Sequence, residues 1–154
     1  MPDVISEMVQ VHVYRQHVDG RVEFLMLQRS SDEEIYPDLW QPVTGAIEPG
    51  EHASDAARRE TIEETGMEPL SLLVVPHVSS FYSPRRDAVH MVPVFAAQVS
   101  QRAEVTLSSE HQAYEWLGFA DAHERSVFPG HRDALRVLME YVLAPIAVPV
   151  LVPA

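Results

Sequence analysis

Cysteine is absent from this sequence, and its absence excludes several functions at once. A chain without cysteine has no disulfide framework, no cysteine zinc site and no thiol nucleophile. The sequence also lacks any run of the roughly 20 apolar residues that a helix needs to cross a bilayer. The N-terminal segment carries Asp3 and Glu7 and has no apolar run, so it does not resemble a signal peptide. We therefore expect a soluble, cytoplasmic protein without a membrane partner.

Basic residues are scarce. The chain has 11 lysine and arginine residues against 23 aspartate and glutamate residues, and its formal net charge is −12. Binding of DNA or RNA through the phosphates requires a basic surface, so we expect no nucleic-acid partner. An acidic protein that acts on phosphates needs a cation at its site, because carboxylates and phosphates otherwise repel each other.

The chain has 154 residues, 46% of them apolar, and we expect residues 1–154 to form a single domain. Alternating and apolar patterns predict strands at residues 9–13, 22–28, 39–47, 70–80, 90–99, 105–107 and 113–117. An Asp19-Gly20 turn joins the first two strands. Helices are predicted at residues 53–65, ended by Gly66, and from Pro129 onward. Strands interleaved with two helices indicate an α/β fold with helices flanking a mixed sheet.

The first predicted helix gathers three carboxylates on one side. At 3.6 residues per turn, Glu60, Glu63 and Glu64 fall within about 100° of one another, on the side that also carries small alanines. Glu60 and Glu64 form a like-charged i,i+4 pair, whose repulsion grows on burial unless a cation is present. A hard ion such as Mg²⁺ takes oxygen ligands and removes this conflict. The alternative is that the glutamates form an ordinary solvated helix face.

The spacing of residues around this helix decides between the two interpretations. Gly45 is followed after five residues by Glu51 and after seven more by the run Arg59-Glu60-Thr61-Ile62-Glu63-Glu64-Thr65-Gly66-Met67. The stretch from Gly45 to Met67 resembles the Nudix box of the Nudix hydrolase superfamily at every fixed polar and glycine position. Thr61 stands where the family more often has an aliphatic residue, which is a mild departure.

The resemblance implies a Nudix-type α/β/α sandwich with a catalytic loop-helix-loop, and Mg²⁺ or Mn²⁺ as cofactor. Carried over by position, Glu60 and Glu64 are direct metal ligands, and Glu63 is a further ligand or the base. Arg59 would orient one of these glutamates, and Glu51 would orient the loop and reach toward the metal. The implied reaction is hydrolysis of a phosphoanhydride bond in a nucleoside diphosphate linked to another group. The metal activates water, and a carboxylate takes the proton of that water.

Two further segments, residues 39–45 and 109–117, are similar to one branch of this superfamily. That branch includes dihydroneopterin triphosphate pyrophosphatase, which is also described as acting on dATP. A glutamate of the second segment contributes to the metal site there, and Glu110 has its position, so the resemblance implies that Glu110 is a ligand or the base. A nucleoside triphosphate-like substrate that releases pyrophosphate is accordingly expected.

Several side chains outside the box are candidates for substrate binding. Arg29 follows a predicted strand, and Arg85 and Arg86 are adjacent on a predicted loop, so each can reach a phosphate. Trp40 and Gln41 belong to the first similar segment and can contact the base, although packing in the core accounts equally well for Trp40.

Other assignments stay open from the sequence. Diadenosine polyphosphates, ADP-ribose and oxidised guanine nucleotides are alternative substrates. A non-catalytic nucleotide-binding module of the same fold is disfavoured because a pure sensor does not need Glu60, Glu63 and Glu64 together. An isomerase of prenyl diphosphates shares the fold but employs a cysteine, which this chain lacks.

The C-terminal segment, residues 144–154, is apolar and contains Pro145, Pro149 and Pro153. It is too short to span a membrane, and its prolines disfavour helix and limit strand pairing. An exposed apolar strip promotes association. We therefore expect its apolar residues to pack in an extended form, either on the surface of the domain or on a second copy of the chain in a homodimer: Ile146, Val148, Val150, Leu151 and Val152.

Overall fold

The computed structural model describes residues 1–144 and 150–152. Its elements, in chain order, are β1 (Asp3–Ile5), β2 (Met8–Gln16), β3 (Val22–Arg29), β4 (Trp40–Gln41), β5 (Val43–Ala46), α1 (Ala53–Thr65), β6 (Ser71–Ser83), β7 (Ala88–Gln98), β8 (His111–Leu117), α2 (Phe119–Arg125), α3 (Pro129–Val137), the π-helix η1 (Leu138–Val142) and β9 (Val150–Leu151). Within the described residues, no helix is both long and apolar enough to cross a membrane.

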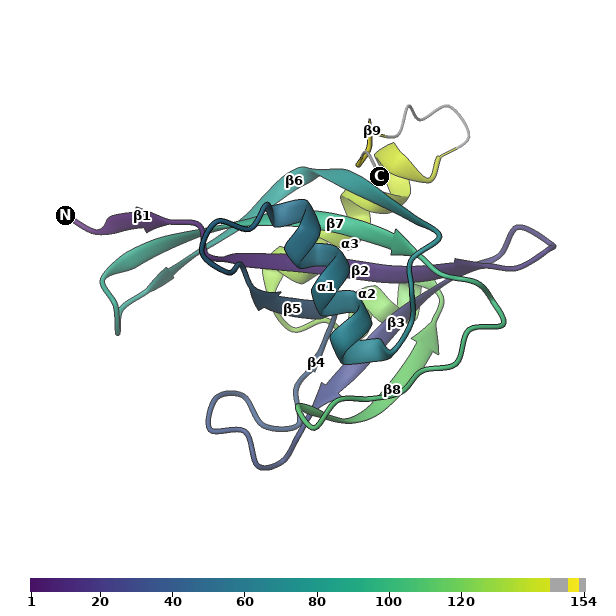
Figure 1. Ribbon diagram of the computed structural model, residues 1–154, viewed down its shortest axis with the longest axis horizontal. Coiled ribbons are helices and arrows are strands. Elements are labelled where there is room, and N and C mark those ends of the chain that lie inside the picture. The colour runs from purple at the N-terminus through teal and green to yellow at the C-terminus, as the bar shows by residue number, and fades with distance from the viewer. Residues whose placement is uncertain (145–149, 153–154) are drawn as a thin grey trace.

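The strands form one mixed sheet with β2 and β7 at its centre (Figure 1). The main path runs β4-β3-β2-β7-β6-β9, while β1 pairs with β7, β5 with β2, and β8 with β3. The pairs β2–β7 and β1–β7 are parallel, and the other pairs are antiparallel. The predicted Asp19-Gly20 turn joins β2 to β3, with Gly20 at a φ of 88°.

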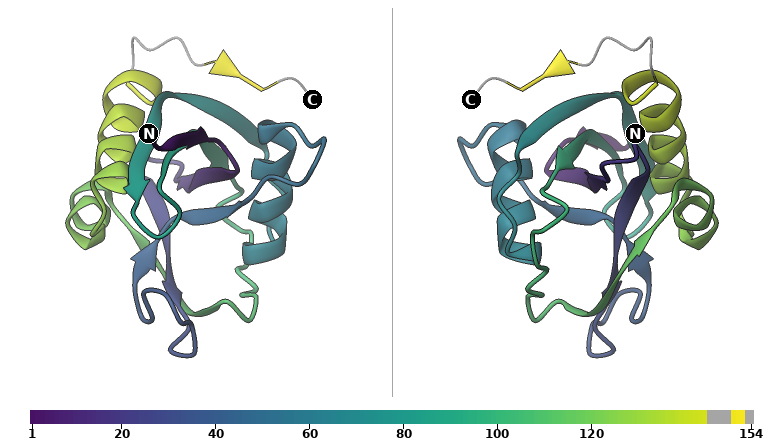
Figure 2. Two further views of the ribbon diagram at one scale, coloured as in Figure 1. Left: turned by 90° about the vertical axis from the view of Figure 1, so that its left-hand side faces the viewer. Right: turned by 90° about the vertical axis from the view of Figure 1, so that its right-hand side faces the viewer.

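Helices cover both faces of the sheet, as Figure 2 shows: α1 lies on one side, and α2 and α3 lie on the other. The alternation of β2 explains the two layers, because Val9 and Val11 enter the core beneath α1 whereas Tyr14 enters the core beneath α2 and α3. The expected α/β/α sandwich is confirmed.

Some local expectations differ from the structure. Residues 39–47 form two strands, β4 and β5, because Pro42 between them has no N–H to donate to a ladder. Residues 105–107, predicted as a strand, are irregular: Val105 and Leu107 pack on the core of α1, while the N–H of Thr106 bonds to the carbonyl of Thr65 at 2.8 Å. The short elements β1 and α2 were not expected from the sequence.

The C-terminal segment packs in an extended form where it is described. Val150 and Leu151 pair with Val74 and Leu73 of β6, and the N–H of Val152 donates to the carbonyl of Leu72 at 3.0 Å. The side chain of Val152 also packs on the core beneath α1. The expected positions Ile146 and Val148 lie outside the described residues.

Candidate active site

The helix α1 begins and ends where the sequence predicted. Ala56 and Ala57 are fully buried, so the helix lies close to the sheet. Gly66 ends the helix at a φ of 71°, in the left-handed region that a residue without Cβ adopts readily. Thr61, the departure from the usual box, is buried, and its hydroxyl donates to the carbonyl of Ala57 at 2.7 Å. The polar side chain is therefore satisfied within the helix.

Glu64 is a buried carboxylate without a counter-charge beside it. Its exposed fraction is 3%, and its Oε2 atom has no hydrogen-bond partner among the described residues. Burial, reinforced by the nearby charges of Glu110 and Glu60, raises the pKa of Glu64 to about 9. Such a group is protonated at neutral pH unless a cation compensates its charge.

Glu60 lies directly over the backbone of β5. A Cβ atom added to Gly45 would be 2.1 Å from the Cδ atom of Glu60, so only glycine leaves room for this carboxylate. Burial raises the pKa of Glu60, although its bond to Arg59 opposes the shift. Gly45, the first residue of the box, therefore allows the side chain of Glu60, a predicted metal ligand, to pack directly against its backbone.

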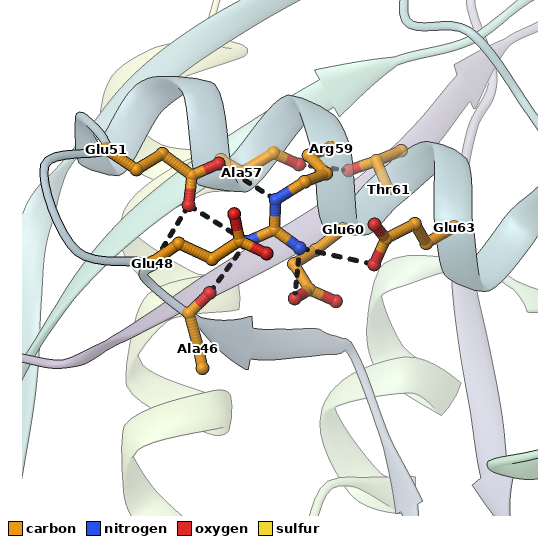
Figure 3. Close-up of polar contacts among 8 residues, drawn as sticks. All are labelled: Ala46, Glu48, Glu51, Ala57, Arg59, Glu60, Thr61 and Glu63. Carbon is orange, nitrogen blue, oxygen red and sulfur yellow. Dashed lines mark hydrogen bonds and ion pairs between the residues drawn. The ribbon is translucent and has the colours of Figure 1, made fainter.

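Arg59 connects the box loop to the helix carboxylates (Figure 3). Its guanidinium donates to both carboxylate oxygens of Glu51, at 2.8 and 3.0 Å, and to the carbonyl of Ala46 at 2.8 Å. It also donates to Glu60 at 2.8 Å and to Glu63 at 3.2 Å. Its hydrogen bonds lower the pKa of Glu51 to about 2. Arg59 thus contacts two glutamates of the helix and is itself held by Glu51, and its orienting role in the site stays a prediction.

The fourth carboxylate comes from the loop that precedes β8. Glu110 lines a cleft of about 130 Å³ together with two serines and the three helix glutamates, namely Ser108, Ser109, Glu60, Glu63 and Glu64. The loop is attached to the helix by the bond between Thr106 and Thr65, and to β3 by a 2.9 Å bond from the N–H of Ser30 to the carbonyl of Glu110. Residues about 50 positions apart in the sequence therefore meet at one acidic cleft.

This cleft fits a hard divalent cation, because it offers carboxylate oxygens and contains a buried, unpartnered Glu64 Oε2. In residues 1–144 and 150–152, however, no three acidic or histidine side chains are already close enough to hold an ion together. Arg59 pairs with Glu60 at 2.8 Å and with Glu63 at 3.2 Å, which holds both carboxylates at the guanidinium. Binding of a cation therefore requires local movement of these side chains.

The candidate phosphate-binding arginines lie in two different places. Arg29 is near the cleft: its charge acts to lower the pKa of Glu64, and it also donates to Glu33 at 3.3 Å and to the carbonyl of Ile35 at 3.1 Å. Arg85 and Arg86 lie at the tip of the β6–β7 hairpin, which Figure 1 shows far to the left of the C-terminal half of α1. Arg86 is paired there with Glu7 at 3.0 Å. The structure does not bring this pair to the carboxylates.

The two residues of the first similar segment lie on β4. Trp40 packs on the core beneath α2 and α3, and the guanidinium of Arg125 lies 4.9 Å from its ring centroid. Gln41 is buried, and its amide nitrogen lies 3.3 Å from the Nε2 atom of His111, the residue after Glu110. Gln41 thus contacts the segment that carries the fourth carboxylate.

Sequence reasoning missed three groups that contribute to the site. Ser108 and Ser109 line the cleft, and the carbonyl of Ala46 accepts a bond from Arg59. Serines in a loop carry no motif of their own, and a backbone carbonyl has no sequence signature. Only their position next to Glu110 and Gly45 could have indicated them.

Comparison with known proteins identifies the family. The NUDIX domain family model matches residues 8–138. The asymmetrical bis(5'-nucleosyl)-tetraphosphatase of Mus musculus is 33% identical over 131 residues, which cover 80% of this chain and 86% of that protein. A C. elegans Ap4A hydrolase, solved as a binary complex, has a TM-score of 0.73 and 27% identity, covering 88% of this chain and 95% of that one. The dihydroneopterin triphosphate pyrophosphohydrolase of E. coli has a TM-score of 0.70 and 28% identity, covering 86% and 92%.

The chain therefore belongs to the Nudix hydrolase family. The expected class of enzyme, a hydrolase of phosphoanhydride bonds in nucleotides, is confirmed, and so is the similarity to the dihydroneopterin triphosphate branch. Hydrolases of this family generally use a divalent metal ion.

Proposed function

We propose that this chain hydrolyses a phosphoanhydride bond of a nucleoside polyphosphate with Mg²⁺, or Mn²⁺ in its place, as cofactor. The observation that carries the proposal is the buried carboxyl group of Glu64, which lies near Glu60 and Glu110 and has an unpartnered oxygen. A protein that only had to be stable would gain by replacing such a group with an apolar one. A divalent ion in the cleft turns this unfavourable group into a ligand.

The residues divide into ligands, a base and an orienting arginine. Glu60 and Glu64 hold the ion, and Glu63 and Glu110 complete its surroundings. When bound, the ion lowers the pKa of a coordinated water and neutralises charge on the phosphate. Glu63 and Glu110 are exposed, so either can accept the proton of the attacking water and release it to solvent. Arg59 keeps Glu60 and Glu63 on the cleft side of the helix.

Two substrate classes are each supported by a specific relative. Similarity to asymmetrical tetraphosphatases and to an Ap4A hydrolase structure favours a dinucleoside tetraphosphate. Similarity to the dihydroneopterin triphosphate pyrophosphohydrolase favours a triphosphate that releases pyrophosphate. In both cases Arg29 contacts a phosphate beside the cleft. Trp40 and Gln41 support the base-binding side, and Arg85 and Arg86 contact the substrate only if it extends to the β6–β7 hairpin.

A substrate panel with metal control tests the proposal. We would assay diadenosine tetraphosphate, dATP, dihydroneopterin triphosphate and ADP-ribose with Mg²⁺, and identify the released nucleotides, phosphate and pyrophosphate. We expect activity on one of the first three, full loss in excess EDTA, and recovery on adding Mg²⁺. Undiminished hydrolysis after verified metal removal would contradict the metal assignment.

The proposal also covers where the enzyme works and what it binds. A net charge of −12 supports a small nucleotide as the partner rather than DNA or RNA. We place the enzyme in the cytoplasm, where nucleotide substrates are abundant. A chain without cysteine has no disulfide bonds that the reducing environment there could break. A homodimer formed through the C-terminal segment is the alternative to the cis packing described above, and light scattering distinguishes the two.

A further inference from the structure

A β-bulge lies where β3 and β8 reach the acidic cleft. Gln28 is opposite Ala113, but Arg29 is opposite His111, so Gln112 is an extra residue in β8. Such a bulge shifts the alternation of the strand and re-aims the side chains that follow it. Here the residues beside the irregularity are Arg29, whose charge acts on Glu64, and Glu110, the fourth carboxylate.

The side chain of the extra residue turns back over the end of β3. The Gln112 amide nitrogen donates to the carbonyl of Arg29 at 2.9 Å and lies 3.2 Å from the hydroxyl of Ser31 and 2.5 Å from Oδ1 of Asp38. The Ser31 hydroxyl donates to the same Asp38 oxygen at 2.7 Å. One amide therefore connects both ends of the loop of residues 30–39 to the start of β8.

Asp38 holds an uncommon backbone conformation that these bonds maintain. Its φ is 64°, in the left-handed region, and its carbonyl accepts a bond from Gln28 at 3.2 Å. Aspartate tolerates this region better than most residues, yet the conformation persists only where neighbouring groups fix it. The same loop returns to β3 through the bond from the Arg29 N–H to the carbonyl of Leu39 at 2.8 Å.

We propose that Gln112 is a positioning residue, which fixes Glu110 and Arg29 relative to each other at the cleft through its bonds to Arg29 and Asp38. The inference rests on the proposed function, because it takes Glu110 and Arg29 as members of the site. The side chains of Gln112, Ser31 and Asp38 are exposed, so the hydrogen bonds among them add little to stability. Their loss therefore affects geometry at the cleft more than it affects folding.

The test combines turnover with direct binding of Mn²⁺ to the full chain, measured from the free Mn²⁺ signal in electron paramagnetic resonance. We expect Gln112→Ala to lower kcat/KM about tenfold, within the range for small displacements of catalytic groups, and to weaken Mn²⁺ binding. Gln101→Ala, which alters an exposed glutamine in the turn after β7, serves as the control and leaves both unchanged.

Exchanging the hydrogen-bond donor and acceptor between positions 112 and 38 distinguishes a positioning role of Gln112 from a purely structural one. Gln112→Glu places a carboxylate against Asp38 and against the carbonyl of Arg29, and it lowers turnover. Adding Asp38→Asn restores a donor–acceptor pair between positions 112 and 38 and recovers part of the loss, while the bond to the Arg29 carbonyl stays absent because a carboxylate has no proton to donate. In a Glu110→Gln background, Gln112→Ala has no further effect on Mn²⁺ binding, because the ligand that it positions is already gone. All variants keep a melting temperature close to that of the parent chain.

The results that would overturn the positioning role and those that would overturn the proposed function are distinguishable. If Gln112→Ala keeps full turnover and Mn²⁺ binding while Glu110→Gln is impaired, the positioning role is wrong and the proposed function stands. If Glu64→Gln and Glu110→Gln both keep full turnover and Mn²⁺ binding, the assignment of these carboxylates to the site is wrong, and the positioning role falls with it. If the parent chain hydrolyses none of the substrates tested, the proposed function is wrong. A parallel loss of melting temperature and turnover in Gln112→Ala, without recovery on charge reversal, also contradicts positioning.

Discussion

The two faces of the sheet bury polar groups in different ways. Beneath α1, Glu64 is buried with an unpartnered oxygen, and its pKa is raised to about 9 by burial and by neighbouring carboxylates. Beneath α3, His12 and His131 are buried, and burial lowers their pKa values to about 3 and about 4. The ring of His12 lies 2.8 Å from the side-chain nitrogen of Gln10, which also donates to a carbonyl at the start of α3.

The different buried groups suggest different roles for the two faces of the sheet: the α1 face carries the candidate site, and the α3 face supports the fold. A neutral imidazole can be buried without an ion, although the Nδ1 atom of His131, like Oε2 of Glu64, has no hydrogen-bond partner among the described residues. The α1 face carries several carboxylates around one cleft and reaches a favourable state only with a cation. We infer that the α1 face, which carries the Nudix box and the acidic cleft, is the face that gains most from a bound cation.

Replacing the buried carboxyl group of Glu64 is expected to have the largest effect on turnover. Glu64→Gln keeps the shape but not the charge that holds the ion, so we expect turnover to fall on the order of 10³-fold, the upper range for one electrostatic group. Without metal, the variant is more stable than the parent, because a buried, repelled carboxyl group is gone. Turnover and thermal melting in EDTA are measured on the same samples.

The matched control for this change is Glu68→Gln. Glu68 lies just beyond α1, is largely exposed and only approaches Arg58 at 3.5 Å. We expect both its turnover and its metal-free stability to match those of the parent chain. Normal turnover in Glu64→Gln would show that this carboxylate is not a ligand.

Adding a side chain at Gly45 is expected to have the next largest effect on turnover. Gly45→Ala places a methyl group where the Glu60 side chain lies, 2.1 Å from its Cδ atom. Glu60 must then move and lose its contact with Arg59, and we expect turnover to fall about 10²-fold, as for displaced catalytic groups elsewhere. Gly118→Ala is the control, since no atom lies within 4 Å of its added Cβ. Equal activity of the two variants would mean that the position of Glu60 is unimportant.

The sequence predicted those parts of the site that are local. The helix of residues 53–65, its end at Gly66 and the grouping of three glutamates all follow from helical spacing and one motif. The contact between Gly45 and Glu60 depends on how the helix packs against β5, which no periodicity reports. The burial of Glu64 likewise depends on the loop that carries Glu110.

Non-local hydrogen bonding explains the failures. Residues 105–107 have the alternation of a strand, but the N–H of Thr106 bonds to the end of α1 rather than to a neighbouring strand. The bulge at Gln112 is a matter of register between β3 and β8, which only the paired structure defines. Arg85 and Arg86 are candidates because of their charge and their adjacent positions on a loop, and that loop is the tip of the β6–β7 hairpin, away from the acidic cleft.

A fall in pH is expected to change the free energy of unfolding in opposite directions through the buried groups of the two faces. In the metal-free chain, the unfolded state protonates His12 and His131 near pH 6.5, whereas the folded state resists protonation down to about pH 3 at His12 and about pH 4 at His131. Each histidine therefore removes about 1.4 kcal/mol of stability per pH unit as the pH falls below 6.5. Glu64 acts oppositely, because its folded pKa of about 9 lies above the unfolded value of 4.5, so falling pH between these values stabilises the chain.

Urea unfolding between pH 6.5 and pH 5 in EDTA measures these slopes. We expect His131→Gln to give a shallower loss of stability with falling pH, and Glu64→Gln to give a steeper one. His52→Gln, which changes an exposed histidine, provides the control. Slopes that do not separate in this order would show that the two faces do not bury their groups in the states described above.

The smallest expected effect concerns the C-terminal segment, which joins β6 at the edge of the sheet. Deleting residues 144–154 removes the β9 pairing, the bond from the Val152 N–H to Leu72, and the packing of Val152 on the core beneath α1. These contacts together amount to about 1–2 kcal/mol, which corresponds to a melting temperature lower by roughly 2–8 °C. Turnover is unchanged, because no residue of the acidic cleft is removed.

Light scattering on the same truncated chain decides where the segment packs. We expect an unchanged mass, because the described residues of the segment pair with the chain's own β6. Val152→Ser alters only the apolar contact and gives a smaller loss of stability. Val18 is exposed to solvent, so the control Val18→Ser gives no loss. A change from dimer to monomer on truncation would assign the segment to an interface between two copies. An unchanged melting temperature at constant mass would contradict the packing in either form, because a paired strand and the packed side chain of Val152 cannot be removed without loss of stability.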